Sequence, residues 1–403
     1  MTDSRTEFDL FSPAAMAEPM PLLHRIRAQE PVAWLPQLGA YLLTRHADVV
    51  AVLKDRRLDV ANMARGMDRL TPRERAELQP LFRSLQLWMG HTDPTDHVRF
   101  QKLLKRYFTP ATVEALRPRV RQITHDLLDA VAPGGRMEAV RDLAYPLPAS
   151  VIAEILGLPA TDRDKLQQWS RDILAVFGIA DVTQFRRAQA SVLAMQDHLR
   201  PLLDERRRAP REDVLSVFAE AEREGLVTEE EILANGVLLL FAGHETTAGL
   251  IGNGLALLFE NPGQLELLKA KPELMRTAVE EMLRYDGPAG VLVRVAAEPV
   301  TVGGREYPAG TQFYLAMVAG NRDPEVFADP DRFDITRTPN RHTAFGLGTF
   351  YCLGAALARM ETDECLRILL ERFPGLRPGE GGPVWQPSLP VGHRLTALPV
   401  ELA

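Results

Sequence analysis

The longest helical pattern in this chain begins after Thr228, ends before Pro262 and limits what the chain can fold into. Thr228 and Glu231 have the spacing of a capping box, which is a signature of a helix N-terminus. At about 1.5 Å per residue, about thirty helical residues span roughly 45 Å. Because the middle of this stretch, GVLLLFAG, is apolar on every side, the helix has to cross the protein interior. The fold must therefore surround one long central helix.

The centre of that helix interrupts its own apolar pattern with AGHETT, residues 242–247. A glycine inside a helix, here Gly243, costs about 1 kcal/mol relative to alanine. A carboxylate such as that of Glu245 is expensive to bury unless it is paired or hydrated. Packing alone does not call for these residues, so we expect the segment to have a function.

The rest of the 403-residue chain predicts a mainly α protein with small β-sheets. Strand and turn signals predict a hairpin over 31–44, and helical periodicity dominates 46–285. Strand-like sequence returns over 291–337, and a last helix is expected over about 354–373. No linker, low-complexity tract or internal repeat marks a boundary, so we expect residues 1–403 to form a single domain.

Composition and charge narrow the partners and the location. The chain is 46% hydrophobic and carries a net charge of −7, which argues against nucleic acid as the main partner. The acidic, proline-interrupted N-terminal sequence is not a signal peptide, and no uncharged apolar run of about 18 residues occurs. We therefore expect no membrane anchor and a cytoplasmic location. The two cysteines, Cys352 and Cys365, are separated by mostly helical sequence that keeps them beyond disulfide reach.

The most specific pattern is the glycine-rich loop AFGLGTFYCLG. It has the form F-x-x-G-x-x-x-C-x-G, with Phe345, Gly348, Cys352 and Gly354 at its fixed positions. Cys352 precedes a predicted helix, whose free N–H groups and positive dipole end favour a thiolate. Together with Gly346, the two glycines of the pattern permit positive φ angles and close approach to a flat ligand. A cysteine is more often an inert buried residue, but this setting predicts a functional thiolate.

This loop resembles the haem-binding loop of the cytochrome P-450 family, the haem-thiolate monooxygenases. The resemblance implies the P-450 fold, with the long central helix lying over a buried haem b. Cys352 is then the ligand of the haem iron, and Phe345, Gly346 and Gly354 belong to the cofactor-binding loop. His97 and Arg294 match the family residues that hold the haem propionates, although a lone histidine is more often an ordinary surface or capped side chain.

The resemblance also assigns a structural cluster. Glu281 and Arg284 form the E-x-x-R pair of the family, whose spacing places both residues on one helix face. Arg332 occupies the position of the arginine that completes a buried triad. A Glu–Arg pair at this spacing is usually a surface salt bridge, so the assignment depends on the other matches.

AGHETT matches the oxygen-activating segment of the family, with Glu245 and Thr246 as the acid and the alcohol. Thiolate ligation favours cleavage of the O–O bond, and that cleavage needs protons at the distal oxygen. We expect Glu245 to carry protons and Thr246 to donate a hydrogen bond to the bound oxygen. Alternatively, the Thr246 hydroxyl bonds back to the carbonyl of Ala242 and has no catalytic role.

A substrate pocket should lie beside this segment, with residues 62–88 and 176–183 as mobile walls. The expected lining residues are small or apolar, and Gly243 among them should leave room for oxygen: Leu239, Ala242, Gly243, Gly290 and Val291. Such a lining implies a small hydrophobic or mixed-polarity organic substrate, and the chemistry expected is a hydroxylation in secondary metabolism.

Two positions depart from the family pattern. The residue two before the cysteine is usually His or Arg and is Phe350 here, and the residue four after His97 is often Arg and is Gln101 here. Because both normally contact propionates, the haem carboxylates should depend more on His97 and Arg294. His342 or a repositioned propionate should make up the difference.

Electrons have to come from a separate protein, since no G-x-G-x-x-G follows a predicted strand. A basic run on the helix of His97 would suit an acidic ferredoxin or flavodoxin that works with its reductase. The run consists of Arg99, Lys102, Lys105 and Arg106. A solvated helix face is an equally good interpretation of these charges.

The sequence therefore predicts a monooxygenase that inserts one oxygen atom from O2 into an organic substrate. A haem-thiolate oxidase that couples radicals or uses peroxide is one alternative, and a non-catalytic haem sensor is another. The adjacent Glu245 and Thr246 argue against both, because a peroxide-driven enzyme has less need of proton delivery and a sensor has none.

Overall fold

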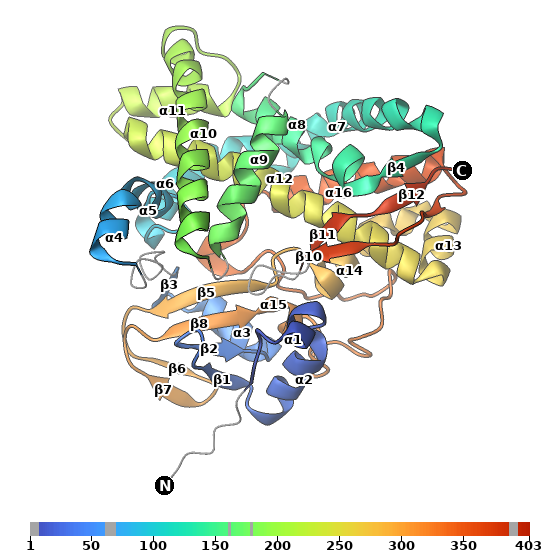
Figure 1. The fold of residues 1–403 in the computed structure, drawn as a ribbon, viewed down its shortest axis with the longest axis horizontal. Coiled ribbons are helices and arrows are strands. Elements are labelled where there is room, and N and C mark those ends of the chain that lie inside the picture. Colours follow the sequence, from blue (N-terminus) through green and yellow to red (C-terminus); the bar gives the residue numbers. More distant parts are fainter. Residues whose placement is uncertain (1–7, 61–69, 160–162, 178–179, 387–393) are drawn as a thin grey trace.

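The computed structural model describes residues 8–60, 70–159, 163–177, 180–386 and 394–403. These residues form a mainly helical fold with small sheets, as the sequence predicts (Figure 1). The earlier helices are α1 (Pro13–Ala17), α2 (Met20–Gln29), α3 (His46–Lys54), α4 (Pro72–Glu77), α5 (Gln79–Gln86), α6 (Pro94–Leu104), α7 (Pro110–Val131) and α8 (Pro146–Leu156). The later helices are α9 (Arg163–Leu174), α10 (Val182–Arg208), α11 (Val214–Arg223), α12 (Glu229–Glu260), α13 (Pro262–Ala270), α14 (Met275–Asp286), α15 (Met317–Gly320) and α16 (Ala355–Arg372).

Helix α12 is the long central helix, 32 residues in length. Its capping box is confirmed: the Thr228 hydroxyl accepts a hydrogen bond from the Glu231 N–H, and the Glu231 carboxylate accepts one from the Thr228 N–H. α12 packs against α8, α14 and α16, and most of its residues are buried. A Cβ on Gly243 would lie 2.5 Å from Cγ1 of Ile152 on α8. Gly243 therefore permits close packing of two helices, whereas the sequence suggested that it makes room for oxygen.

The largest sheet has the strand order β1-β2-β8-β5-β3. Its strands are β1 (Val32–Leu35), β2 (Ala40–Leu43), β3 (Leu58–Val60), β5 (Val291–Ala296) and β8 (Gln312–Ala316). β1 and β2 form the predicted antiparallel hairpin, and β2 runs parallel to β8. In Figure 1 this sheet lies with α1, α2 and α3 below most of the helices.

The other sheets are small. One has the order β4-β12-β9, and two are the pairs β6-β7 and β10-β11. Their strands are β4 (Arg136–Glu138), β6 (Val300–Val302), β7 (Arg305–Tyr307), β9 (Arg377–Pro378), β10 (Val384–Gln386), β11 (Arg394–Ala397) and β12 (Pro399–Glu401).

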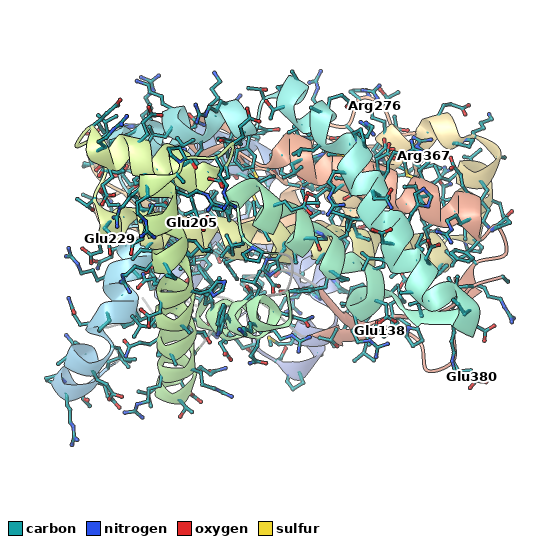
Figure 2. All side chains as sticks on the ribbon, turned by 90° about the horizontal axis from the view of Figure 1, so that it is seen from above. Glu138, Glu205, Glu229, Arg276, Arg367 and Glu380 are labelled. Atoms are coloured by element: carbon teal, nitrogen blue, oxygen red, sulfur yellow. The ribbon has the colours of Figure 1, made fainter. Side chains whose placement is uncertain are left out.

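One large hydrophobic core fills the helical part, and two smaller clusters pack against the five-stranded sheet. Charged side chains lie around the outside of the helices, as the labelled Glu205, Glu229, Arg276 and Arg367 show (Figure 2). Among the described residues, every helix is too short or too polar to cross a membrane. The expectation that residues 1–403 form a single domain stays a prediction.

Candidate functional site

The loop around Cys352 is a tight backbone turn between a single helical turn, Gly348–Phe350, and α16. The Cys352 N–H donates a hydrogen bond to the Phe345 carbonyl at 3.0 Å. Gly346 and Gly348 have φ angles of 68° and 73°, so the predicted positive φ is confirmed for both. A Cβ on Gly348 would lie 2.9 Å from the Leu53 carbonyl oxygen, which leaves no space for a side chain. The loop therefore lies directly on the end of α3.

Gly354 differs from the other two glycines. Its φ is −85°, and a Cβ there would meet no protein atom within 4 Å. The expectation of a positive φ is wrong at this position, and the space that a side chain would fill is open. This open space beside Cys352 suits the close approach of a flat ligand.

Cys352 is accessible to solvent, although many protein atoms lie close around its thiol. Burial raises the pKa of the thiol, while the backbone N–H of Gly354 and the charge of Arg359 act in the opposite direction. The effect of burial on the thiol pKa thus outweighs that of the helix N-terminus. Without a ligand the thiol form is favoured, contrary to the predicted thiolate. Binding of a metal would itself deprotonate the thiol.

Arg294 and His97 each keep part of their hydrogen-bonding capacity unused within the described ranges. Arg294 is buried on β5, and its Nη1 donates to the Val293 carbonyl at 2.9 Å. Burial lowers the pKa of Arg294 to about 10, while Asp59 acts in the opposite direction. His97 Nδ1 lies 2.8 Å from the Met89 carbonyl oxygen, and its buried Nε2 has no hydrogen-bond partner within the described ranges. Both side chains are suited to an anionic ligand.

Phe350 lies between these two residues. Its half-buried ring is 4.5 Å from the His97 ring, centroid to centroid, and 5.3 Å from the guanidinium carbon of Arg294. His342 does not make up for the missing polar group, because its Nε2 lies 2.9 Å from Glu280 and its Nδ1 accepts the Ala344 N–H. The expectation for His342 is therefore wrong.

The centre of α12 has two exposed residues, Ala242 and Thr246, within a largely buried helix. The Thr246 hydroxyl donates to the Ala242 carbonyl at 3.1 Å, which is the purely structural alternative for this side chain. Glu245 is 3% exposed, and its Oε1 lies 3.5 Å from Nε2 of His244. The sequence interpretation gave no role to His244, which is fully buried and bonded to Tyr145.

The structure does not place all of the predicted pocket residues around one cavity. Leu239 and Gly290 are buried, and the Gly290 carbonyl accepts the Val318 N–H. Val291 lines a small apolar cavity on the opposite face of β5 from Arg294, so its assignment to the pocket is wrong. Strand alternation places Leu292 on the face of Arg294 instead.

Of the predicted pocket walls, residues 62–69 and 178–179 lie outside the described residues. Residues near these segments form an aromatic cluster that the sequence did not indicate. The rings of Phe177 and Phe241 stack at 5.6 Å, and Trp88 lies 6.0 Å and 5.7 Å from them. Phe241 directly precedes the exposed Ala242, so these rings lie next to the AGHETT segment.

The E-x-x-R pair is confirmed as buried, but Arg332 is not its third partner. Arg284 donates from Nε and Nη2 to the two carboxylate oxygens of Glu281, at 2.7 Å and 2.8 Å. Arg337 Nε lies 3.2 Å from both oxygens. The Arg332 side chain is 65% exposed, and this residue contributes only its carbonyl, which accepts from Arg284. The arginine that completes the cluster is Arg337, five positions after the expected Arg332.

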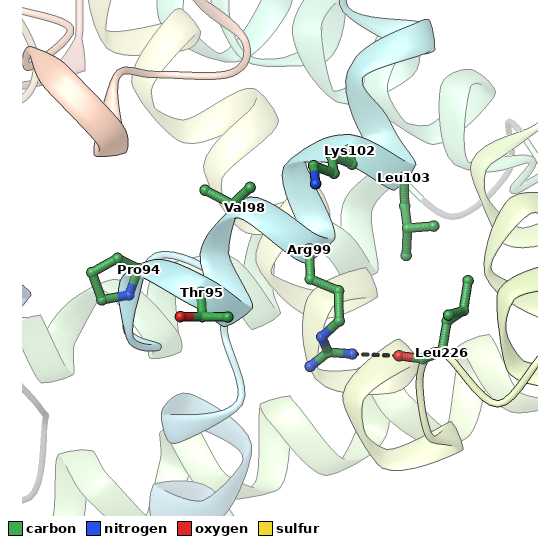
Figure 3. Close-up of a pocket in the computed structure, with 7 residues that line it drawn as sticks. All are labelled: Pro94, Thr95, Val98, Arg99, Lys102, Leu103 and Leu226. Carbon is green, nitrogen blue, oxygen red and sulfur yellow. Dashed lines mark hydrogen bonds between the residues drawn. The ribbon is translucent and has the colours of Figure 1, made fainter.

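The basic run on α6 is only partly available to a partner. Arg99 donates to the carbonyl of Leu226 (Figure 3). It also donates to Asp96 and Glu231, so its charge is paired within the protein. Lys102, Lys105 and Arg106 are exposed. Lys102 also borders a groove of about 580 Å³, which is lined by Pro94, Thr95, Val98, Arg99, Lys102, Leu103 and Leu226.

The chain is similar to known proteins over most of its length. The sequence model of the family described as Cytochrome P450 matches residues 268–384. Cytochrome P450 107B1 of Saccharopolyspora erythraea is 43% identical over 344 residues, which are 84% of this chain and 83% of that protein. The 6-deoxyerythronolide B hydroxylase of the same organism is 36% identical over 378 residues, 92% of each chain.

A solved structure agrees with this fold. The crystal structure of P450BioI in complex with an acyl carrier protein that carries hexadec-9Z-enoic acid matches with a TM-score of 0.90. The match has 33% sequence identity and covers 97% of this chain and 99% of the other.

These findings define the class as a haem-thiolate enzyme, and the chain belongs to the cytochrome P450 family. It is a monooxygenase with haem b as its cofactor. The residues present fit this group. The open space at Gly354, the buried Arg294 guanidinium and the unpartnered Nε2 of His97 suit a flat ring with two carboxylates.

Proposed function

We propose that this monooxygenase hydroxylates a small hydrophobic or mixed-polarity organic molecule in secondary metabolism. The observation that carries the proposal is the centre of α12, where a buried acid, Glu245, stands beside the exposed Ala242 and Thr246. A haem sensor does not need an acid and an alcohol at this place. Neither does an enzyme that is supplied with peroxide.

The residues have separate roles in this proposal. Cys352 binds the haem iron, and Arg294 and His97 bind the propionates. When bound, the haem supplies thiolate-supported O–O cleavage and insertion of one oxygen atom into the substrate. Glu245 would carry protons toward the O2 site, and the Thr246 hydroxyl, which bonds the Ala242 carbonyl, would turn to donate a hydrogen bond there.

The substrate class rests on the surroundings and on the relatives. Phe177, Phe241 and Trp88 provide an aromatic surface beside Ala242, which suits an apolar substrate. A related protein that is 36% identical is named as a hydroxylase of 6-deoxyerythronolide B. This name supports a secondary metabolite as the substrate here.

A redox partner supplies the electrons, and we infer an acidic ferredoxin or flavodoxin with its reductase. Lys102, Lys105 and Arg106 are the exposed cations that would attract it. Leu226, which is 47% exposed at the rim of the neighbouring groove, offers an apolar contact. The expected cytoplasmic location stays a prediction.

The thiolate role is tested with Cys352→Ser. We expect this variant to lose the long-wavelength band of the reduced carbon monoxide complex, because an alcohol does not replace the thiolate. Cys365→Ser, on the buried side of α16, is the control and should keep the band. If Cys352→Ser keeps the band, the assignment of the iron ligand is wrong.

A panel of metabolites is first screened for compounds that shift the iron spin state, which identifies the substrate class. Turnover of these compounds with a surrogate ferredoxin then tests whether the protein is an enzyme. In this assay Thr246→Ala should still bind haem and substrate but lose coupling, measured as product formed per reductant consumed. Unchanged coupling would leave Thr246 with the structural role that its bond to Ala242 indicates.

A further inference from the structure

Three polar side chains meet where α8 contacts the centre of α12. Tyr145 directly precedes α8, and His244 and Glu245 are neighbours on α12. Nε2 of His244 lies 2.6 Å from the Tyr145 hydroxyl and 3.5 Å from Oε1 of Glu245. The Tyr145 and His244 rings meet edge to face, with centroids 4.9 Å apart and planes at 73°. One imidazole nitrogen therefore lies close to both a phenol and a carboxylate.

Helix packing alone does not explain this group. Tyr145 packs against Ala149 and Ala248, so its surroundings are apolar. His244 is fully buried, and its Nδ1 has no hydrogen-bond partner in the described part of the chain. An unsatisfied buried polar atom costs about 1–3 kcal/mol, which an apolar side chain would avoid. His244 is therefore expected to have a role beyond joining two helices.

The role follows from the position of Nε2. When Nε2 carries a hydrogen, the N–H donates to the Tyr145 oxygen at 2.6 Å and has the Glu245 carboxylate, at 3.5 Å, as a second and weaker acceptor. When Nε2 lacks the hydrogen, it accepts the phenol O–H, and Glu245 loses that donor. Because Tyr145 can bond this nitrogen as donor or as acceptor, it fixes the imidazole in either case, and the position of the hydrogen changes only what the imidazole offers to Glu245.

We propose that His244 and Tyr145 are positioning residues that hold Glu245 ready for proton delivery. Tyr145 orients the imidazole, and the imidazole sets the resting position of the carboxylate. This inference rests on the proposed role of Glu245 as the proton carrier. It adds two residues that act through Glu245.

The test compares single side-chain changes in the haem-loaded enzyme. Tyr145→Phe removes one hydroxyl and keeps the ring, and His244→Phe removes both nitrogens. The matched control is Ser150→Ala, which removes a buried α8 hydroxyl that bonds only the Pro146 carbonyl within its own helix. The readouts are coupling and the infrared stretching band of the Glu245 side chain, carboxylate or carboxylic acid, which is assigned by subtracting the spectrum of Glu245→Gln.

We expect His244→Phe to lower coupling about fivefold, the effect of losing roughly one hydrogen bond. Tyr145→Phe should lower coupling less and shift the Glu245 band, and Ser150→Ala should change neither. If His244→Phe does not fold, Tyr145→Phe tests the proposal alone through the band and the coupling.

Two results separate failure of this inference from failure of the proposed function. If Glu245→Gln leaves coupling unchanged, Glu245 is not the proton carrier and the proposed function loses its acid. If Glu245→Gln lowers coupling while Tyr145→Phe leaves both coupling and the band unchanged, the positioning role is wrong and the proposed function stands. Equal loss of melting temperature in Tyr145→Phe and Ser150→Ala, with coupling unchanged, would also overturn the positioning role.

Discussion

Arg284 and Arg294 are both buried arginines, ten positions apart in the sequence, but their surroundings differ. Arg284 is bonded through Nε, Nη1 and Nη2 to Glu281 and to backbone carbonyls such as that of Asn321. Arg294 bonds only the carbonyl of Val293 within the described ranges, and burial lowers its pKa to about 10. The first guanidinium is satisfied by the protein, whereas the second is available to an anion that the protein does not supply.

The comparison separates scaffold from site. A buried charge with all of its hydrogen bonds made resists change, and its removal leaves its partner unpaired. A buried charge with few partners is unfavourable until a ligand binds it. Arg294 is therefore unfavourable in the haem-free fold and becomes favourable when it binds a propionate, as in the proposed function.

The largest effect on stability is expected from removal of Arg284, whose guanidinium is hydrogen-bonded within the protein. Arg284→Ala should lower the free energy of unfolding by about 3–5 kcal/mol, because it leaves the Glu281 carboxylate buried beside fewer cations. Denaturant titration of the haem-free protein measures this change. Arg332→Ala is the control, since its exposed guanidinium should contribute less than about 1 kcal/mol. Equal losses in the two variants would restore Arg332 as the triad arginine.

A third arginine, Arg359, lies beside the cysteine loop and is paired with Glu280. We expect this pair, like that of Arg284 with Glu281, to stabilise the fold. Arg359 bonds Glu280, which also accepts from His342, and it lies 4.4 Å from the Phe345 ring centroid. Burial raises the pKa of Glu280, but the bonds from His342 and Arg359 outweigh it and lower the pKa to about 2.

Because the folded pKa of Glu280 lies below its ordinary value, this carboxylate stabilises the fold above about pH 4.5 and loses that effect as the pH falls toward 2. Glu280→Gln should cost at most about 3 kcal/mol at neutral pH and almost nothing at pH 2. Unfolding of both proteins over this pH range measures the difference. A difference that does not depend on pH would show that the ionised carboxylate is not what matters.

Removal of the Arg294 guanidinium should weaken haem binding and should not lower the stability of the haem-free protein. Arg294→Ala removes a charge-assisted hydrogen bond worth about 1.5–3 kcal/mol, so haem should dissociate about 10- to 100-fold faster. The haem-free variant should be as stable as the parent protein or more stable. Loss of apoprotein stability comparable to that of Arg284→Ala would remove the distinction between the two arginines.

The smallest effect concerns Phe350, which lies between His97 and Arg294. Since phenylalanine cannot bond a propionate, Arg294→Ala should cost more here than in a Phe350→His background, by about 1 kcal/mol. A double-mutant cycle on haem loss rates measures this coupling. Equal penalties in both backgrounds would rule out compensation, and slower electron transfer in Phe350→His would then indicate a docking role.

The sequence predicted the central helix and the cysteine loop well, because both carry local signals. Thr228 and Glu231 determine a cap by direct contact, and glycines at positive φ are typical of a tight loop. Val291 was assigned to the wrong face although strand alternation from Arg294 would have indicated Leu292. That error was avoidable from the sequence.

Other features had no local signal. Arg332 and Arg337 lie in an irregular segment, where spacing does not determine which side chain turns inward. The bond between Tyr145 and His244 joins residues 99 positions apart, so the packing of α8 on α12 alone brings them together. The contact of Phe350 with His97 likewise depends on tertiary packing and not on the local sequence.

The contact of Gly348 with the Leu53 carbonyl has a consequence for the order of assembly. The turn that presents Cys352 lies on the end of α3, so it can take its final shape only after the N-terminal part of the chain has docked. A contact between residues so far apart in sequence requires a large loop to close first, so we expect it to form late in folding. We therefore expect haem to be captured by a nearly folded protein, and its arrival to complete folding instead of starting it.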